Sequence, residues 1–359
     1  MRKTVSHDML RRTAGPPDHR TTDSFMGTIR TIDAHTAGEP LRLIVDGFPR
    51  IEGSTMLERR EFLRAEHDHL RTALMLEPRG HADMYGALLT EPEHADSDAG
   101  VLFMHNEGYS TMCGHGIIAV VTIAIERGLI VPREGRDAIL LDSPAGTIRA
   151  KATVRQVHGR TRVERVSFVN VPSFTLHGAV PVRLGTRELR VDVAFGGAFY
   201  AIVDSESTGI PIVRERLTDL RLAGMAIKHA VEAAVRVEHP IEPALNGIYG
   251  TIFTGPPSSD DAHLRNVTIF ADAEVDRSPC GTGTCAVMAV LSAMGLLDEN
   301  GTFVHESLIG TRFRGRIAGN TAIGEIPAIL PEIEGDAYII GEHTFLIDKT
   351  DPLRYGFRV

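Results

Sequence analysis

The spacing of apolar residues predicts the same series of elements twice along the chain. A helical period of apolar positions covers about 55–74, and Thr55 with Glu58 has the spacing of a capping box at its start. A second helical pattern covers about 213–236. In each half, short strand-like runs follow the helix and lead to a glycine-rich turn and a long apolar stretch. The chain is therefore expected to contain two structurally equivalent units.

The two apolar stretches, at 117–125 and 285–297, have no continuous polar face. A helix that is apolar on all sides must be buried. The strand-rich segments at 138–193 and 302–350 would wrap one such helix each. We therefore expect an α+β fold of two pseudo-symmetric domains, each a curved, mostly antiparallel sheet around a central buried helix, with the active site in the cleft between them.

The length of 359 residues also favours two domains, because a single hydrophobic core rarely grows beyond about 250–300 residues. The polar segment 1–26 lacks the apolar core of a signal peptide and predicts a disordered tail, with Met26 as a more natural start. We expect the first domain over 27–184, the second over 185–335, and a segment over 336–359 that returns to the first domain.

Composition and charge argue against several classes of protein. No apolar run approaches the roughly 20 residues that span a bilayer. The formal net charge of -9, without a basic stripe, argues against nucleic acid as a partner but is compatible with a small anionic ligand. The 3 cysteines do not build a disulfide framework, which favours a reducing cytoplasm. A homodimer is compatible with these observations.

Each half places one cysteine directly before a Gly-x-Gly turn, Cys113 in the first and Cys280 in the second. The thiolate is the reactive form of cysteine, and the positive end of a helix lowers the pKa of a thiol. Gly114 and Gly281 let the backbone approach a ligand closely, and the free N–H groups of a helix start bind carboxylates. We therefore expect each loop to supply a proton-transfer group and half of a carboxylate site.

Two such loops across a cleft would place one sulfur on each face of an amino-acid α-carbon. A proton removed from one face and returned to the other inverts that centre without a cofactor or a metal, provided that the two thiols hold opposite protonation states. His115 is close enough in sequence to orient the carboxylate or to adjust the reactivity of Cys113. Asp276 is close enough to accept hydrogen bonds from a substrate ammonium group.

Other interpretations of these residues explain less. Cys113 with His115 suggests a thiol hydrolase, but side chains two residues apart in a turn rarely meet in hydrogen-bond geometry, and Cys280 would go unexplained. Cys280 and Cys285 miss the usual spacing of zinc ligands, and Cys285 is expected to pack inside its helix. Tyr200 is expected in a strand core.

The segments 112–116 and 276–284 resemble the two signature loops of the proline racemase family, which includes proline racemases, 4-hydroxyproline 2-epimerases and trans-3-hydroxy-L-proline dehydratases. The resemblance runs from about Thr31 to the C-terminus. It implies the two-domain fold shared with diaminopimelate epimerase. It also implies these site residues: Cys113 and Cys280 as the acid/base pair, Gly114, His115, Gly281 and Thr282 around the carboxylate, and Asp276 near the substrate nitrogen.

Two features bear on which member of this family the chain resembles most. The family's dehydratases typically carry threonine where this chain has Cys280, whereas the segment 105–111 looks like the dehydratase loop. The polar Ser110 within it suggests a ring hydroxyl on the substrate, because a site without a partner would bury that hydroxyl unsatisfied. We therefore expect a trans-3-hydroxy-L-proline dehydratase with 2-epimerase activity. The alternatives are a 4-hydroxyproline 2-epimerase and, after it, a proline racemase. A protein that binds proline-like ligands without turnover is a further alternative, although binding alone needs no exchangeable protons.

Overall fold

The computed structural model describes residues 27–131, 133, 135–298 and 300–359. The tail expected over 1–26 lies outside these residues. The first half of the chain forms β1 (Thr28–Thr36), β2 (Glu39–Asp46), α2 (Met56–Glu66), α3 (Asp68–Met75), β3 (Tyr85–Thr90), β4 (Ala99–His105), β5 (Tyr109–Ser110), α4 (Gly114–Glu126), β6 (Ile139–Ser143), β7 (Gly146–Val157) and β8 (Arg160–Val169).

The second half repeats this plan. It forms β9 (Phe174–Leu184), β10 (Arg187–Phe195), β11 (Phe199–Asp204), α5 (Ser205–Thr208), the 3-10 turn η1 (Arg214–Arg216), α6 (Leu217–Ala234), the 3-10 turn η2 (Pro243–Leu245), β12 (Ile248–Gly255), β13 (Leu264–Phe270), β14 (Glu274–Asp276), α7 (Gly281–Ala293), β15 (Phe303–Glu306), β16 (Arg312–Ile323) and β17 (Ile326–Gly335). The last strand, β18 (Ala337–Leu346), returns to the first half.

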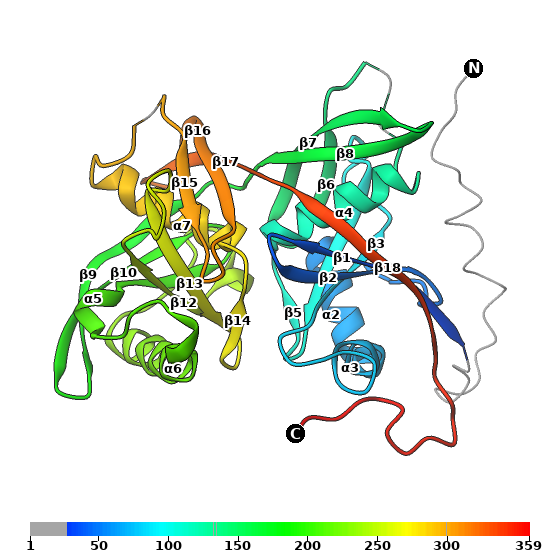
Figure 1. Ribbon diagram of the computed structural model, residues 1–359, viewed down its shortest axis with the longest axis horizontal. Helices are drawn as coiled ribbons and strands as arrows, with labels where there is room; N and C mark the ends of the chain where they lie inside the picture. Colours follow the sequence, from blue (N-terminus) through cyan, green and yellow to red (C-terminus); the bar gives the residue numbers. More distant parts are fainter. Residues whose placement is uncertain (1–26, 132, 134, 299) are drawn as a thin grey trace.

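Each half is a curved sheet around one buried helix, and the two halves lie side by side (Figure 1). The helix α4 packs against β8, β1 and β18, while α7 packs against β10, β17 and β9. Most strand pairs are antiparallel, with parallel exceptions such as β2 with β3 and β11 with β12. The α+β fold expected from the two apolar helices is therefore present. Within the described residues, no helix combines the length and apolarity needed to cross a bilayer.

The helix expected over about 55–74 is two helices rather than one. Its capping box forms as predicted, with the Glu58 N–H donating to the Thr55 side chain at 3.1 Å and the Glu58 carboxylate accepting from Thr55 N at 3.2 Å. However, His67 leaves helical geometry and separates α2 from α3. This break turns α3 so that Arg71 donates to the backbone carbonyl of His105 at 2.8 Å, which ties α3 to the end of β4.

Strand pairing across the middle of the molecule joins the two halves. The strand β9 pairs with β10 of the second half, so the chain changes halves between β8 and β9, earlier than the boundary expected at 184–185. In the other direction β17 pairs with β8, and β18 pairs with β1 from Thr28 opposite Leu346 to Thr36 opposite Ala337. Figure 1 shows the chain passing from β17 in one half to β18 in the other.

The short strand β14 is held by the first half through charged groups. The Asp83 carboxylate accepts from Arg221 at 2.6 Å and from Val275 N at 3.2 Å. Arg277, directly after β14, donates its backbone N–H to the Glu39 carboxylate at 2.7 Å. Because β14 contains Asp276, these interdomain contacts also position the polar side of the site described below.

Candidate active site

The starts of the helices α4 and α7 meet at two glycines. Gly114 and Gly281 are the first residues of these helices, and a Cβ atom added to either would lie 2.5 Å from the Cα atom of the other. Only residues without a side chain allow this approach. The unpaired N–H groups of both helices therefore converge between the two halves, where they can bind an anionic group.

The two cysteines cap these helices in the same way. The Cys113 sulfur accepts from Gly116 N and the Cys280 sulfur accepts from Gly283 N, both at 3.3 Å. The residues are only 4% and 6% exposed. Both thiols therefore lie beside the converging helix starts, in a site that is closed to solvent.

The backbone of the two cysteine loops differs in one respect. Cys113 is extended, with φ -144°, whereas Cys280 has φ 61°, in the left-handed region that non-glycine residues rarely adopt. The Asp276 carboxylate accepts from the N–H and hydroxyl of Ser278, at 2.8 and 2.7 Å, and the Ser278 hydroxyl accepts from Cys280 N at 3.1 Å. This turn holds Cys280 in a strained conformation, as is common for residues at functional sites.

The expected lowering of the thiol pKa is wrong for this closed arrangement. Burial raises the pKa of Cys113 well above its usual value, and the Gly116 N–H opposes this only in part. Burial, with the nearby Asp276 charge, raises the pKa of Cys280 to about 12. The loss of solvation outweighs the helix start because the site excludes water. Both thiols are therefore neutral in the closed site at physiological pH.

His115 contacts Cys113, although the sequence argued against such a contact. Its Nδ1 atom lies 3.2 Å from the Cys113 sulfur. The first turn of α4 brings the two side chains together because both point back toward the helix start. Burial lowers the pKa of His115, which keeps the imidazole neutral. A neutral ring can exchange a hydrogen bond with the thiol, but it adds no positive charge that would stabilise a thiolate.

Buried tyrosines complete the site, although Tyr200 was expected in a strand core and Tyr85 was not among the expected site residues. The Tyr200 hydroxyl lies 2.7 Å from the Thr282 hydroxyl and 3.8 Å from the Cys280 sulfur, so Tyr200 faces the site rather than the strand core. Tyr85 occupies the matching place beside Cys113, with its hydroxyl 2.5 Å from that of Ser110. Tyr200 follows the core residue Phe199 in β11, and neighbouring side chains of a strand point to opposite faces. This alternation could have indicated that Tyr200 faces away from the side that Phe199 occupies.

The residues that the sequence singled out therefore gather at one place. Cys113, His115 and Gly114 come from the start of α4, and the chain after β14 brings Cys280, Gly281 and Thr282 from the start of α7. The charge of Asp276 raises the pKa of both thiols, and Ser110 is connected to the site by its hydrogen bond with Tyr85. Within the described part of the chain, histidine, cysteine and acidic side chains form no group of three or more that could hold a metal ion.

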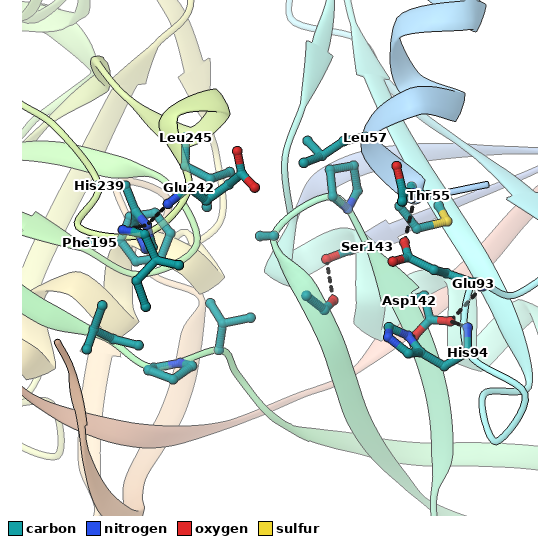
Figure 2. A pocket seen from close by; sticks show the side chains of 18 residues that line it. Thr55, Leu57, Glu93, His94, Asp142, Ser143, Phe195, His239, Glu242 and Leu245 are labelled. Atoms are coloured by element: carbon teal, nitrogen blue, oxygen red, sulfur yellow. Dashed lines mark hydrogen bonds and ion pairs between the residues drawn. The ribbon is translucent and has the colours of Figure 1, made fainter. Parts of the chain in front are cut away.

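A separate cavity of about 520 Å³ opens between the two halves (Figure 2). Thr55, Leu57 and Ser143 line one side of it, and Phe195 and Leu245 line the other. Neither Cys113 nor Cys280 lines this cavity. This cavity therefore lies beside the thiol site and is not itself the place where the thiols meet a substrate.

Comparison with known proteins places the chain among enzymes that act on proline derivatives. The sequence model described as proline racemase matches residues 31–358. A trans-3-hydroxy-L-proline dehydratase of Bacillus cereus is 50% identical over 327 residues, which cover 91% of this chain and 97% of that protein. A 3-hydroxyproline 2-epimerase of Burkholderia multivorans is 43% identical, covering 92% and 98%. The crystal structure of a hydroxyproline epimerase from Agrobacterium vitis, with bound trans-4-hydroxy-L-proline, superimposes with a TM-score of 0.84 at 31% identity, covering 92% and 96%.

The raised pKa values predict how the thiols react with iodoacetamide. The rate at which Cys113 and Cys280 are alkylated should rise about tenfold per pH unit from pH 7 to 9, because only the thiolate reacts. It should continue to rise above pH 9, where a free thiol levels off. The measurement is mass spectrometry of each cysteine, with glutathione as the reference. Rapid alkylation that is independent of pH above 7 would show that a thiolate is already present.

The glycine contact predicts an effect of a single added methyl group. Gly281→Ala should prevent full closure and speed alkylation of both thiols at pH 7.5 by about tenfold, because partial solvation lowers the pKa of both thiols. Gly178→Ala is the matched control, since its added Cβ has only one neighbouring atom within 4 Å, at 3.9 Å. Equal reactivity in the two variants would mean that the helix starts do not need this contact.

Proposed function

The chain belongs to the proline racemase family, and we propose that it dehydrates trans-3-hydroxy-L-proline to Δ1-pyrroline-2-carboxylate, with 2-epimerisation as a second outcome. The observation that carries this proposal is the pair of thiols that cap two facing helix starts. The dehydratase name of the relative at 50% identity and the 2-epimerase name of the relative at 43% support the two outcomes.

The substrate carboxylate binds at the converging helix starts. The N–H groups of Gly114, His115, Gly281 and Thr282 surround this point, and helix starts attract anions. The substrate ammonium group then faces Asp276, which is 4% exposed. The positive charge of the ammonium group favours the thiolate form of Cys113, which burial alone disfavours. The base is thus generated when the substrate is bound.

Dehydration needs only one of the two thiols. In trans-3-hydroxy-L-proline the hydroxyl is trans to the carboxylate, so it lies on the same ring face as the α-hydrogen. The Cys113 thiolate removes the α-proton, the bond between C3 and the hydroxyl oxygen breaks, and the new thiol returns the proton to the leaving hydroxide as water. The resulting enamine tautomerises to the cyclic imine. Exclusion of water and the N–H groups at the carboxylate lower the barrier to proton removal.

Epimerisation needs the second thiol on the opposite face. Cys280 is protonated, because its pKa is about 12, and it donates a proton to the α-carbon after Cys113 has removed the original one. The presence of both thiols also favours a second candidate function, 2-epimerisation of trans-4-hydroxy-L-proline to cis-4-hydroxy-D-proline. Both reactions suit the cytoplasm, where the thiols stay reduced and free.

A substrate comparison in D2O tests the proposed function. The protein should convert trans-3-hydroxy-L-proline to a cyclic imine, detected by its colour reaction, and should incorporate deuterium at the α-carbon, detected by NMR. Faster exchange with trans-4-hydroxy-L-proline and no imine would select the 4-hydroxyproline 2-epimerase. Absence of imine and of exchange with both substrates and with L-proline would leave only a ligand-binding protein.

Serine substitutions separate the roles of the two thiols. Cys113→Ser should lower the rates of both reactions by about 10³-fold or more, because the base is lost. Cys280→Ser should lower the rate of epimerisation by a similar factor, while dehydration stays measurable. Cys285→Ser is the matched control, because Cys285 lies in the same helix as the Cys280 cap but inside the core. Equal loss of both reactions in Cys280→Ser would contradict dehydration on one face.

A further inference from the structure

Two buried polar side chains near the thiols have no hydrogen-bond partner among the described residues. They are the hydroxyl of Tyr249 and the carboxylate of Glu274. The Glu274 side chain is only 5% exposed, and the ring of His105 approaches it, with Nδ1 3.2 Å from Oε2. Buried polar groups are normally paired, so such groups call for an explanation.

A bulge in β12 turns Tyr249 toward the site. In the pairing of β11 with β12, Phe199 lies opposite Ile248 and Tyr200 lies opposite Gly250, which leaves Tyr249 without a partner on β11. Such an extra residue re-aims a side chain and is common beside active sites. Here it brings the Tyr249 ring to the face that Tyr200 occupies, with the two ring centres 5.9 Å apart.

The surroundings of Tyr249 place it between the two halves of the molecule. Its ring stacks on Phe270 of the second half at 5.5 Å and meets the edge of His105, from the first half, at 6.1 Å. Burial and the nearby Glu274 charge raise the pKa of Tyr249, while an interaction with the Tyr85 hydroxyl acts against this shift. A thiolate at Cys113 or Cys280 would raise it further. The hydroxyl therefore stays protonated and lies within the field of both thiols.

The Tyr249 hydroxyl and the Glu274 carboxylate act on each other electrostatically, and neither has a hydrogen-bond partner among the described residues. A substrate hydroxyl is itself both a donor and an acceptor, so it can pair with both groups at once. Ser110, which the sequence assigned to this role, already shares a hydrogen bond of 2.5 Å with Tyr85. We propose that the ring hydroxyl of the substrate accepts from the Tyr249 hydroxyl and donates to the Glu274 carboxylate. This assignment rests on the proposed function and names the residues that select a hydroxylated ring over L-proline.

The test compares a hydroxylated substrate with one that lacks the hydroxyl. Tyr249→Phe should lower kcat/KM for trans-3-hydroxy-L-proline by about 10- to 100-fold, because the hydrogen bond to the substrate is lost. The inhibition constant of L-proline, measured in competition, should change by less than about threefold. Tyr109→Phe is the matched control, since its hydroxyl is also buried and unpartnered but its ring lies 5.7 Å below the Arg71 guanidinium, away from the thiols.

A second variant separates this role of Glu274 from binding of the substrate nitrogen. Glu274→Gln keeps an acceptor oxygen. It should therefore lower kcat/KM for the hydroxylated substrate less than Tyr249→Phe does, and it should leave the inhibition constant of L-proline unchanged. The assignment would be overturned if either variant weakened the binding of L-proline as much as it lowered kcat/KM for the hydroxylated substrate. It would also be overturned if Tyr249→Phe left that kcat/KM unchanged. If the unaltered protein acts on neither hydroxyproline, the proposed function itself fails, which is a distinguishable result.

Discussion

The contact between Gly114 and Gly281 is the constraint on which the site depends. It brings the starts of two buried helices together without an intervening side chain. Because helix starts leave N–H groups unpaired, the contact creates one point with donors from both halves. Each helix is capped by a cysteine sulfur, so the same contact also sets the distance between the thiols. The curved sheets around α4 and α7 hold these helices in line, and the sheet pairings between halves limit how they separate.

Closure has an electrostatic cost that the substrate itself offsets. Burial raises the pKa of both thiols, so the closed protein alone does not hold a thiolate. In the proposed complex, a zwitterionic substrate would bring a carboxylate to the helix starts and an ammonium group to the thiols and Asp276. Charged contacts around β14 hold Asp276 in place: Arg277 with Glu39, and Asp83 with Arg221. Burial and the Asp276 charge raise the pKa of Glu39 well above its usual value, while Arg277 acts against this shift. The proposed mechanism therefore confines proton abstraction to the closed complex with ligand.

Local patterns predicted the fold and the position of the site, while details that depend on distant segments were beyond them. The capping box at Thr55, the buried helices and the paired cysteine loops follow from short stretches of sequence. The break at His67 places Arg71 against the end of β4, a distant segment that no local pattern reveals. The bulge that aims Tyr249 depends on the register between β11 and β12. The sign of the thiol pKa shifts depends on how completely the two halves exclude water, a property of the assembled site.

The proposed mechanism requires the two thiols to lie on opposite faces of one α-carbon whose carboxylate binds at both helix starts. The most direct measurement is a crystal structure of the Cys113→Ser variant with bound trans-3-hydroxy-L-proline. We expect carboxylate oxygens within about 3 Å of N–H groups from both α4 and α7, with the side chains of residue 113 and Cys280 on opposite faces of the ring. A carboxylate bound by one helix alone, or both side chains on one face, would contradict it.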